Sequence, residues 1–145
     1  MPTRAWLAAL PRDPVALYER LAADTARSTV SPSSKAVGLV ADLLRDGSVP
    51  ADVRRAVFAA LGYVPEVVVE RGAARAPDGR ALSVLRVDTD GPGVVSRYEL
   101  QVDEATGQVV VERSLRGEPG GDLRPRSVTT ATTAVVDAIG VAPVG

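Results

Sequence analysis

The clearest pattern of apolar and polar positions lies in the stretch 97–115, RYELQVDEATGQVVVERSL. Tyr98, Leu100 and Val102 alternate with polar residues, which is the period of a half-buried strand. The acidic turn that follows ends in Gly107, and a glycine there can supply the positive φ that closes a longer hairpin loop. The segment VVVERSL then returns as a second strand, so the pattern predicts a β-hairpin.

Three helices are predicted in the N-terminal part of the chain, over 14–23, 35–46 and 51–61. In the first, Asp13 suits the N-cap and Pro14 suits the first helical position. Each of the three segments has apolar residues three and four positions apart, which places them on one face of a helix. The second and third are each followed by a glycine, a residue that often ends a helix.

The segment 25–34 between the first two helices is polar and small, and it contains Pro32, which we expect to break any helix there. We therefore predict a loop, with Ser34 as the cap of the next helix. Ser31 and Lys35 come close to the Ser-x-x-Lys signature of acyl-transferring enzymes. The spacing fails, because Pro32 stands where the serine would be, three residues before the lysine.

From residue 64 onward the apolar period changes to two, which indicates strands. We predict strands over 67–70 and 81–88, then the hairpin, then a strand over 127–139, where Val and Thr are dense and β-branching favours a strand over a helix. For the strand 81–88 the pattern does not decide which face is buried, because two pairs of apolar residues compete for it: Leu82 with Val84, and Leu85 with Val87.

The order of elements, helices first and strands afterwards, predicts an α+β fold. We expect three N-terminal helices packed on one face of an antiparallel sheet of about five strands, arranged as a meander. A chain of 145 residues is long enough for one domain with its own core. No internal repeat or strong boundary divides it, so we predict a single domain over 1–145.

The amino-acid composition limits the classes of function that the chain can have. Aromatic content is 3%, so the core must be built from Val, Leu and Ala. The net charge of −1, with Arg54 and Arg55 too few to form a basic stripe, argues against nucleic acid as a partner. There is no histidine and no cysteine, which removes the commonest general base and the commonest metal ligands. We therefore expect no enzymatic activity, no catalytic residue, no cofactor and no metal.

One segment partly matches a calcium-binding loop. Counting from Asp88, the positions of Asp90, Gly93 and Glu99 agree with the third, sixth and twelfth positions of such a loop. The fifth position is Pro92, which offers no side-chain oxygen, and the flanking segments are predicted strands rather than helices. We expect an acidic β-turn followed by a strand in which Glu99 faces solvent.

Two carboxylate pairs, Asp103 with Glu104 and Glu66 with Glu70, are the remaining candidates for acid–base chemistry. Glycosidase-type catalysis needs two carboxyl groups that face each other across a cleft with their pKa values pushed apart. All four residues suit turns or solvent-facing positions, so we expect a solvated surface. No apolar run approaches the roughly 20 residues of a membrane span, so we expect no direct membrane insertion by this segment.

Three segments in order, LAALPRDPVALYERL, LVADLLRDGSVPADVRRAVFAALGYVPEV and YELQVDEATGQVVVERSL, carry a family resemblance. They resemble the extracytoplasmic C-terminal domain of an uncharacterised actinobacterial family of single-span membrane-anchored proteins. Such proteins are often encoded beside extracytoplasmic-function sigma factors. The resemblance covers roughly 7–115 and is most specific in 10–14 and 43–61. It implies that 1–145 is excised from a larger membrane-anchored protein and lies on the extracytoplasmic face. If these residues are the whole protein, we expect it in the cytoplasm.

The first hypothesis for function is therefore a non-catalytic extracytoplasmic binding or sensing domain of a membrane-tethered protein, regulatory or otherwise. Its partner would be an unknown protein or a small apolar ligand, and the chain would be a monomer or a weak dimer. One alternative is a carrier of a small apolar ligand or lipid in a pocket between sheet and helices. Another is a small inhibitory module of a secreted peptidase.

Overall fold

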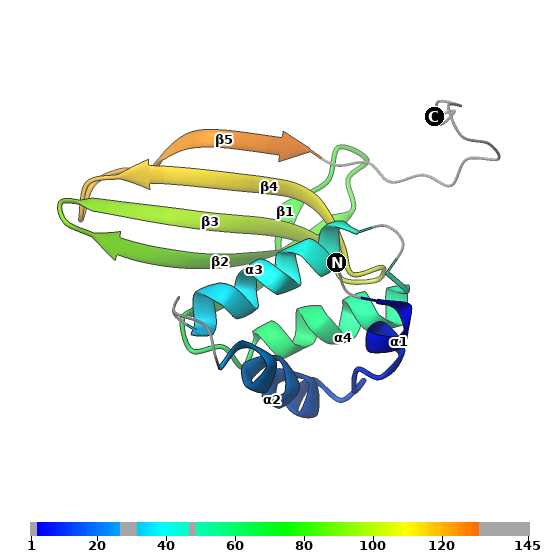
Figure 1. Cartoon of the computed structure of the whole chain (residues 1–145). Helices are drawn as coiled ribbons and strands as arrows, with labels where there is room; N and C mark the ends of the chain where they lie inside the picture. The colour runs from blue at the N-terminus through cyan, green and yellow to red at the C-terminus, as the bar shows by residue number, and fades with distance from the viewer. Residues whose placement is uncertain (1–2, 27–31, 47–48, 131–145) are drawn as a thin grey trace.

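The computed structural model describes residues 3–26, 32–46 and 49–130 of the chain. Within them, four helices precede five strands in an α+β fold with an antiparallel sheet (Figure 1). The helices are α1 (Arg4–Ala8), α2 (Pro14–Thr25), α3 (Pro32–Arg45) and α4 (Ala51–Leu61). The strands are β1 (Val67–Arg75), β2 (Ala81–Gly91), β3 (Val94–Asp103), β4 (Gln108–Gly117) and β5 (Arg124–Thr130).

The prediction of three helices was wrong in number, because α1 was missed. With five residues, α1 is too short to show an apolar period, and it is held at its start by Thr3, whose hydroxyl accepts the N–H of Trp6 at 3.1 Å. The start of α2 is confirmed. Its predicted cap, Asp13, accepts the N–H of Ala16 at 2.9 Å, which satisfies one of the free donors of the first turn.

The start of α3 corrects the predicted loop. The helix begins at Pro32 and not at Lys35, so the loop expected over 25–34 is wrong over 32–34, while 27–31 lie outside the described residues. Proline lacks an N–H, but the first turn of a helix does not need that donor, so Pro32 opens α3 instead of breaking it. The loop is also wrong at Thr25, which ends α2 and whose hydroxyl donates to the carbonyl of Leu21 at 2.9 Å.

The five strands form one sheet in the order β1-β2-β3-β4-β5, each antiparallel to the next, so the meander is confirmed. β1 is longer than predicted because Gly72, at φ +63°, allows a bulge between Glu70 and Ala74, after which pairing resumes. The predicted strand 127–139 is described only up to Thr130, the last residue of β5, and the remainder lies outside the described residues.

The open question about β2 is answered by the core. Leu85, fully buried, belongs to the same apolar cluster as helix residues such as Leu44 and Val57, and Val87 packs against that cluster. Leu82 and Val84 point to the opposite face because side chains alternate along a strand. They are nevertheless buried as well, so both faces of the first half of β2 are covered.

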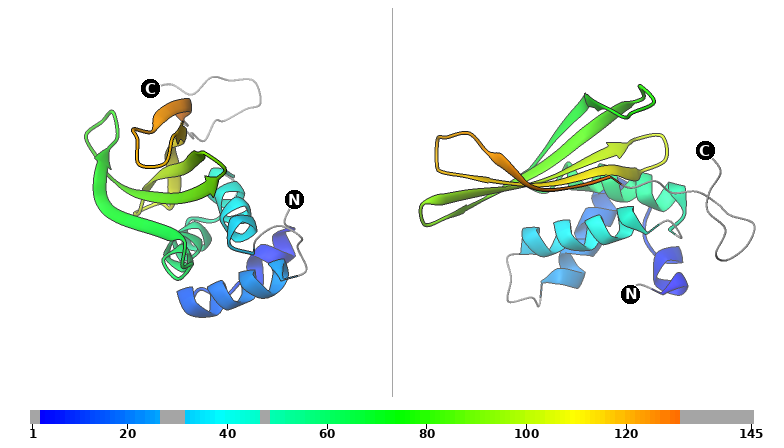
Figure 2. Two further views of the ribbon diagram at one scale, coloured as in Figure 1. Left: turned by 90° about the vertical axis from the view of Figure 1, so that its left-hand side faces the viewer. Right: turned by 90° about the horizontal axis from the view of Figure 1, so that it is seen from above.

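The helices α2, α3 and α4 contact one another, and α3 also contacts β4. The sheet is strongly curved, with β1 and β2 turned out of line with β4 and β5 (Figure 2). This places one side of α3 alongside the middle strands, where the site described next is found. No helix in the described part of the chain has the length and apolar content needed to cross a membrane.

Candidate functional site

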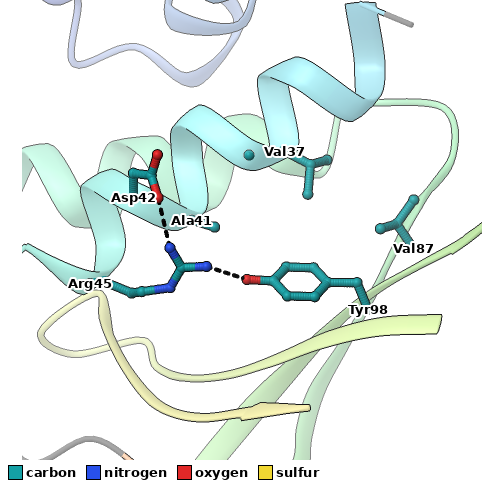
Figure 3. Close-up of a pocket in the computed structure, with 7 residues that line it drawn as sticks. Val37, Ala41, Asp42, Arg45, Val87 and Tyr98 are labelled. Carbon is teal, nitrogen blue, oxygen red and sulfur yellow. Dashed lines mark hydrogen bonds and ion pairs between the residues drawn. The ribbon is translucent and has the colours of Figure 1, made fainter. Parts of the chain in front are cut away.

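A groove of about 290 Å³ lies between α3 and the two neighbouring strands β2 and β3 (Figure 3). We call it the α3 groove. The sheet contributes Val87 and Tyr98, which are cross-strand partners and so point to the same face. The residues that α3 contributes are Val37, Gly38, Ala41, Asp42 and Arg45.

The walls of the groove are mainly apolar because of the residue spacing on α3. Val37 and Ala41 are four residues apart and therefore lie on one face of the helix, with Arg45 one further turn along. Val37 and Ala41 are buried, and Val87 and the ring of Tyr98 lie across from them (Figure 3). Arg45 and the neighbouring Asp42 bring charge to one end of this wall, so the groove is apolar over most of its length and polar at that end.

Gly38 leaves part of the groove empty. A Cβ built on this residue would have no atom within 4 Å apart from its chain neighbours and the backbone of its own helix. Glycine in a helix interior costs about 1 kcal/mol relative to alanine. Since no clash at Gly38 requires the absence of a side chain, this glycine lowers helix stability and widens the groove.

The polar end of the groove is a network around Arg45. Its Nη1 donates to Oδ1 of Asp42 at 2.6 Å, and its Nε donates to Oε2 of Glu112 at 2.8 Å. Its Nη2 donates to the hydroxyl of Tyr98 at 2.7 Å and to Oε1 of Glu112 at 3.1 Å. The Tyr98 hydroxyl in turn donates to the same Oε1 at 2.9 Å. The network therefore ties α3 to β3 and β4.

Two groups of this network, Tyr98 and Arg45, keep their protons near neutral pH. Burial, together with the hydrogen bond to Glu112, raises the pKa of Tyr98 to about 12, so its hydroxyl stays protonated. The hydrogen bond to Glu112 raises the pKa of Arg45 above its already high ordinary value. With Arg45 charged and the Tyr98 hydroxyl protonated, this arrangement can bind and orient a polar group through directed hydrogen bonds.

The partial calcium loop does not form a cluster. Asp88 is held by Arg97, whose Nε and Nη2 each donate to one carboxylate oxygen at 2.7 Å, and this lowers the pKa of Asp88. Glu99 accepts a hydrogen bond from Gln101 at 3.0 Å. Among the described residues, no group of three or more potential protein ligands could hold a metal ion.

The carboxylates of the hairpin turn have structural partners. Asp103 accepts the N–H of Ala105 at 2.9 Å and forms an ion pair with Arg80. Glu104 forms an ion pair with Arg71 and accepts the hydroxyl of Ser83.

Ser83 also accepts the N–H of Gly72 at 3.2 Å, so it links the hairpin turn to the bulge of β1. This hydroxyl is buried and engaged on both sides, which suits a structural tie better than a nucleophile. Of the Ser31 and Lys35 pair, Ser31 and the side chain of Lys35 lie outside what the structure describes.

Sequence reasoning missed the Arg45 network entirely. Arg45 lies 53 residues before Tyr98 and 67 residues before Glu112, and no local spacing relates positions so far apart. The available signal was the four-residue spacing from Val37 to Arg45, which could have shown that one charge shares the apolar face of α3.

Comparisons of the chain with models of known families, with curated proteins and with solved structures gave no match. The resemblance to a membrane-anchored actinobacterial family therefore remains a prediction from sequence. Any function has to be inferred from the α3 groove and from the residues around it.

Proposed function

We propose that the chain is a non-catalytic binding or sensing domain of a membrane-tethered, extracytoplasmic protein, and that the α3 groove holds its ligand. The ligand is a small and largely apolar molecule with a polar group at the Arg45 end. The observation that carries this proposal is Gly38. It leaves open space along an apolar wall at a position where alanine would make the helix more stable.

The size and lining of the groove support a small ligand. Its volume of about 290 Å³ lies just below the usual range for ligand pockets, which is roughly 300–1,000 Å³. Val37, Ala41 and Val87 offer apolar contact, and the Arg45–Tyr98 pair offers polar groups that fix orientation. A ligand with one apolar body and one polar end matches this arrangement better than a long lipid chain does.

The non-catalytic assignment is supported by the residue types near the groove. The sequence contains no histidine and no cysteine. Tyr98, with its pKa raised to about 12, stays protonated at neutral pH and cannot accept a proton there. The carboxylates of Asp42 and Glu112 are both occupied by Arg45. Neither histidine, the commonest general base, nor a deprotonated Tyr98 is therefore available in the groove to take a proton at pH 7.

We also propose that the helices form one layer on one face of the sheet, and that a membrane tether lies outside this segment. The tether and the extracytoplasmic location are supported by the sequence resemblance. They are tested by fractionating the natural host and treating intact spheroplasts with protease. A chain that stays in the soluble cytoplasmic fraction, protected from protease, would contradict this part of the proposal.

A second candidate function, favoured by the same apolar walls, is a carrier. A carrier has to release its ligand to an acceptor, whereas a sensing domain only has to report occupancy. The two are distinguished by measuring transfer of a bound ligand to acceptor vesicles. Transfer through a collision-dependent step would favour the carrier, and simple dissociation into solution would favour the sensor.

The ligand itself is tested by mass spectrometry under native and denaturing conditions on chain purified from its natural host. We expect an added mass that disappears on denaturation. Gly38→Leu should abolish the added mass, because the leucine side chain occupies the open space in the groove. Ala23→Leu is the matched control, since Ala23 is an exposed helix residue on α2 outside the groove. An added mass that persists in Gly38→Leu would place the ligand elsewhere.

A further inference from the structure

A row of side chains crosses the sheet on the face opposite to the core residues of β2 and β3. Following the register from β1 to β5, the row reads Val68, Arg86, Glu99, Arg113 and Val128. Directly opposed side chains on neighbouring strands lie close enough to interact. Two guanidinium groups therefore flank one carboxylate, and an exposed valine lies at each end of the row.

The two arginines of this row differ in how well they are paired. Arg86 forms an ion pair with Glu70 at 2.9 Å. Arg113 reaches the carboxylate of Glu99 only at 3.7 Å, which is beyond hydrogen-bond distance. The Nε of Arg113 is buried and has no hydrogen-bond acceptor among the described residues. Glu99 instead accepts a hydrogen bond from Gln101 at 3.0 Å. Arg113 therefore lies beside the Glu99 carboxylate without donating a hydrogen bond to it.

A hollow of about 360 Å³ lies on this face of the sheet. It is lined by Glu70, Ala73, Ala74, Arg75, Val84, Arg86, Glu99, Gln101 and Arg113. Its charged groups are three guanidiniums, from Arg75, Arg86 and Arg113, and two carboxylates, from Glu70 and Glu99. The local balance is therefore one positive charge, although the whole chain carries a net charge of −1.

We propose that this hollow binds an oxyanion, the carboxylate or phosphate group of a soluble molecule or of a lipid headgroup, with Arg113 as its main donor and Arg86 as its second. A guanidinium can donate two parallel hydrogen bonds to a carboxylate or phosphate, and such charge-assisted bonds are among the strongest in proteins. An incoming oxyanion supplies the acceptor that Arg113 lacks and neutralises the surplus positive charge.

This oxyanion site is separate from the α3 groove. The groove uses Val87 and Tyr98, whereas the hollow uses their strand neighbours Arg86 and Glu99, which point to the other face of the sheet. The two sites can therefore be occupied or removed independently, and the failure of one proposal leaves the other unaffected.

The test titrates the folded chain with inorganic phosphate and, separately, with citrate, at constant ionic strength set by chloride so that general screening does not change. Amide chemical shifts are followed by NMR. We expect saturable shifts centred on β3 and β4 around Arg113. Arg113→Gln should weaken the affinity about tenfold or more, because it removes charge-assisted hydrogen bonds. Arg113→Lys should recover part of it, since lysine keeps the charge and loses the bidentate geometry.

Arg97→Gln is the matched control. Arg97 lies on the same face and carries the same charge, but its Nε and Nη2 already donate to the two carboxylate oxygens of Asp88. Its removal should change the affinity by less than about twofold if specific hydrogen bonds decide binding. An equal loss in Arg97→Gln and Arg113→Gln would overturn the proposal in favour of general electrostatic attraction.

A second variant keeps the proposal testable if Arg113→Gln fails to fold. Glu99→Gln removes the carboxylate that competes for Arg113, so it should tighten oxyanion binding several-fold. The source of the oxyanion is separated by adding vesicles of phosphatidylglycerol. Arg113-dependent binding to vesicles alone assigns the site to a lipid headgroup, and binding of phosphate or citrate assigns it to a soluble ligand. Unchanged or weaker binding in Glu99→Gln, or no Arg113-dependent binding to any of the three probes, would overturn the proposal.

Discussion

Gly107 lies so close to Arg54 that a Cβ built on Gly107 would be 2.6 Å from the Cβ of Arg54. Gly107 also has a φ of +67°, a conformation that residues with a side chain rarely adopt. Arg54 is buried on α4, and its Nε donates to the carbonyl of Thr106 at 3.1 Å. The tip of the β3–β4 hairpin is therefore docked directly onto a helix, and this contact joins the two halves of the fold.

Gly107→Ala should lower the free energy of unfolding by about 2–4 kcal/mol, since it combines backbone strain with a clash against α4. Gly93→Ala is the matched control, because Gly93 has the same φ of +67° but open space around its Cβ. It should cost only about 1 kcal/mol, from the backbone conformation alone. Urea denaturation of both variants measures the difference. Equal costs would show that the hairpin tip moves away from α4 without penalty.

Arg54→Met should destabilise the fold by about 2–3 kcal/mol, because it leaves one buried and one half-buried carbonyl group without their donors. Those carbonyls belong to Val49 and Thr106, and both are reached by the Arg54 side chain. Arg55→Met is the control, because Arg55 is exposed and donates to the carbonyl of Ala105 at the surface. We expect a change within about 0.5 kcal/mol for it. Thermal unfolding of the two variants shows whether the buried guanidinium contributes more to stability than the exposed one.

The sequence predicted those features that depend on neighbouring residues. The Asp13 cap and the hairpin closed by Gly107 were found because their signals lie within a few positions. Pro32 was misread because proline is permitted at the start of a helix and excluded only from its interior. The bulge at Gly72 lengthened β1 beyond its apolar run, and a glycine alone did not indicate it.

The candidate sites lay out of reach of such reasoning for a different reason. The Arg45 network joins residues 53 and 67 positions apart, and the Arg86–Glu99–Arg113 row depends on the register of three strands. A shift of one residue in any strand would move these side chains to the other face of the sheet. Periodicity indicates that strands exist, but it does not fix which residues oppose one another across them.

Gly38→Ala should raise the free energy of unfolding by about 0.5–1 kcal/mol, because it removes the conformational freedom of glycine from the unfolded chain and has room for its methyl group. Thermal and urea unfolding measure the gain. A loss of stability would mean that the α3 groove closes around Gly38 in solution. The gain in stability, set beside the ligand loss expected for Gly38→Leu, would show that this position favours an open groove over a stable helix.

Ionisation of Tyr98 should make the free energy of unfolding depend on pH in the alkaline range. Its pKa in the folded chain is raised from 10.0 to about 12, chiefly by burial. A group whose folded pKa is raised contributes stability that is complete below its unfolded pKa and is lost as the pH rises through the folded value. Stability should therefore fall between about pH 10 and 12, where Arg45, which donates to the Tyr98 hydroxyl, remains charged. Tyr98→Phe should lose about 1–2 kcal/mol at pH 7, with its two hydrogen bonds, and show a shallower alkaline decline.

The measurement is urea denaturation at intervals from pH 7 to pH 11.5. Tyr63→Phe is the control, because Tyr63 is an exposed tyrosine that packs against Tyr18 and lies outside the Arg45 network. It should keep the wild-type profile across the whole range. If Tyr98→Phe declined as steeply as the wild type, ionisation of Tyr98 would not be the cause of the alkaline loss. The hydroxyl would then be more open to water than its contacts with Arg45 and Glu112 imply.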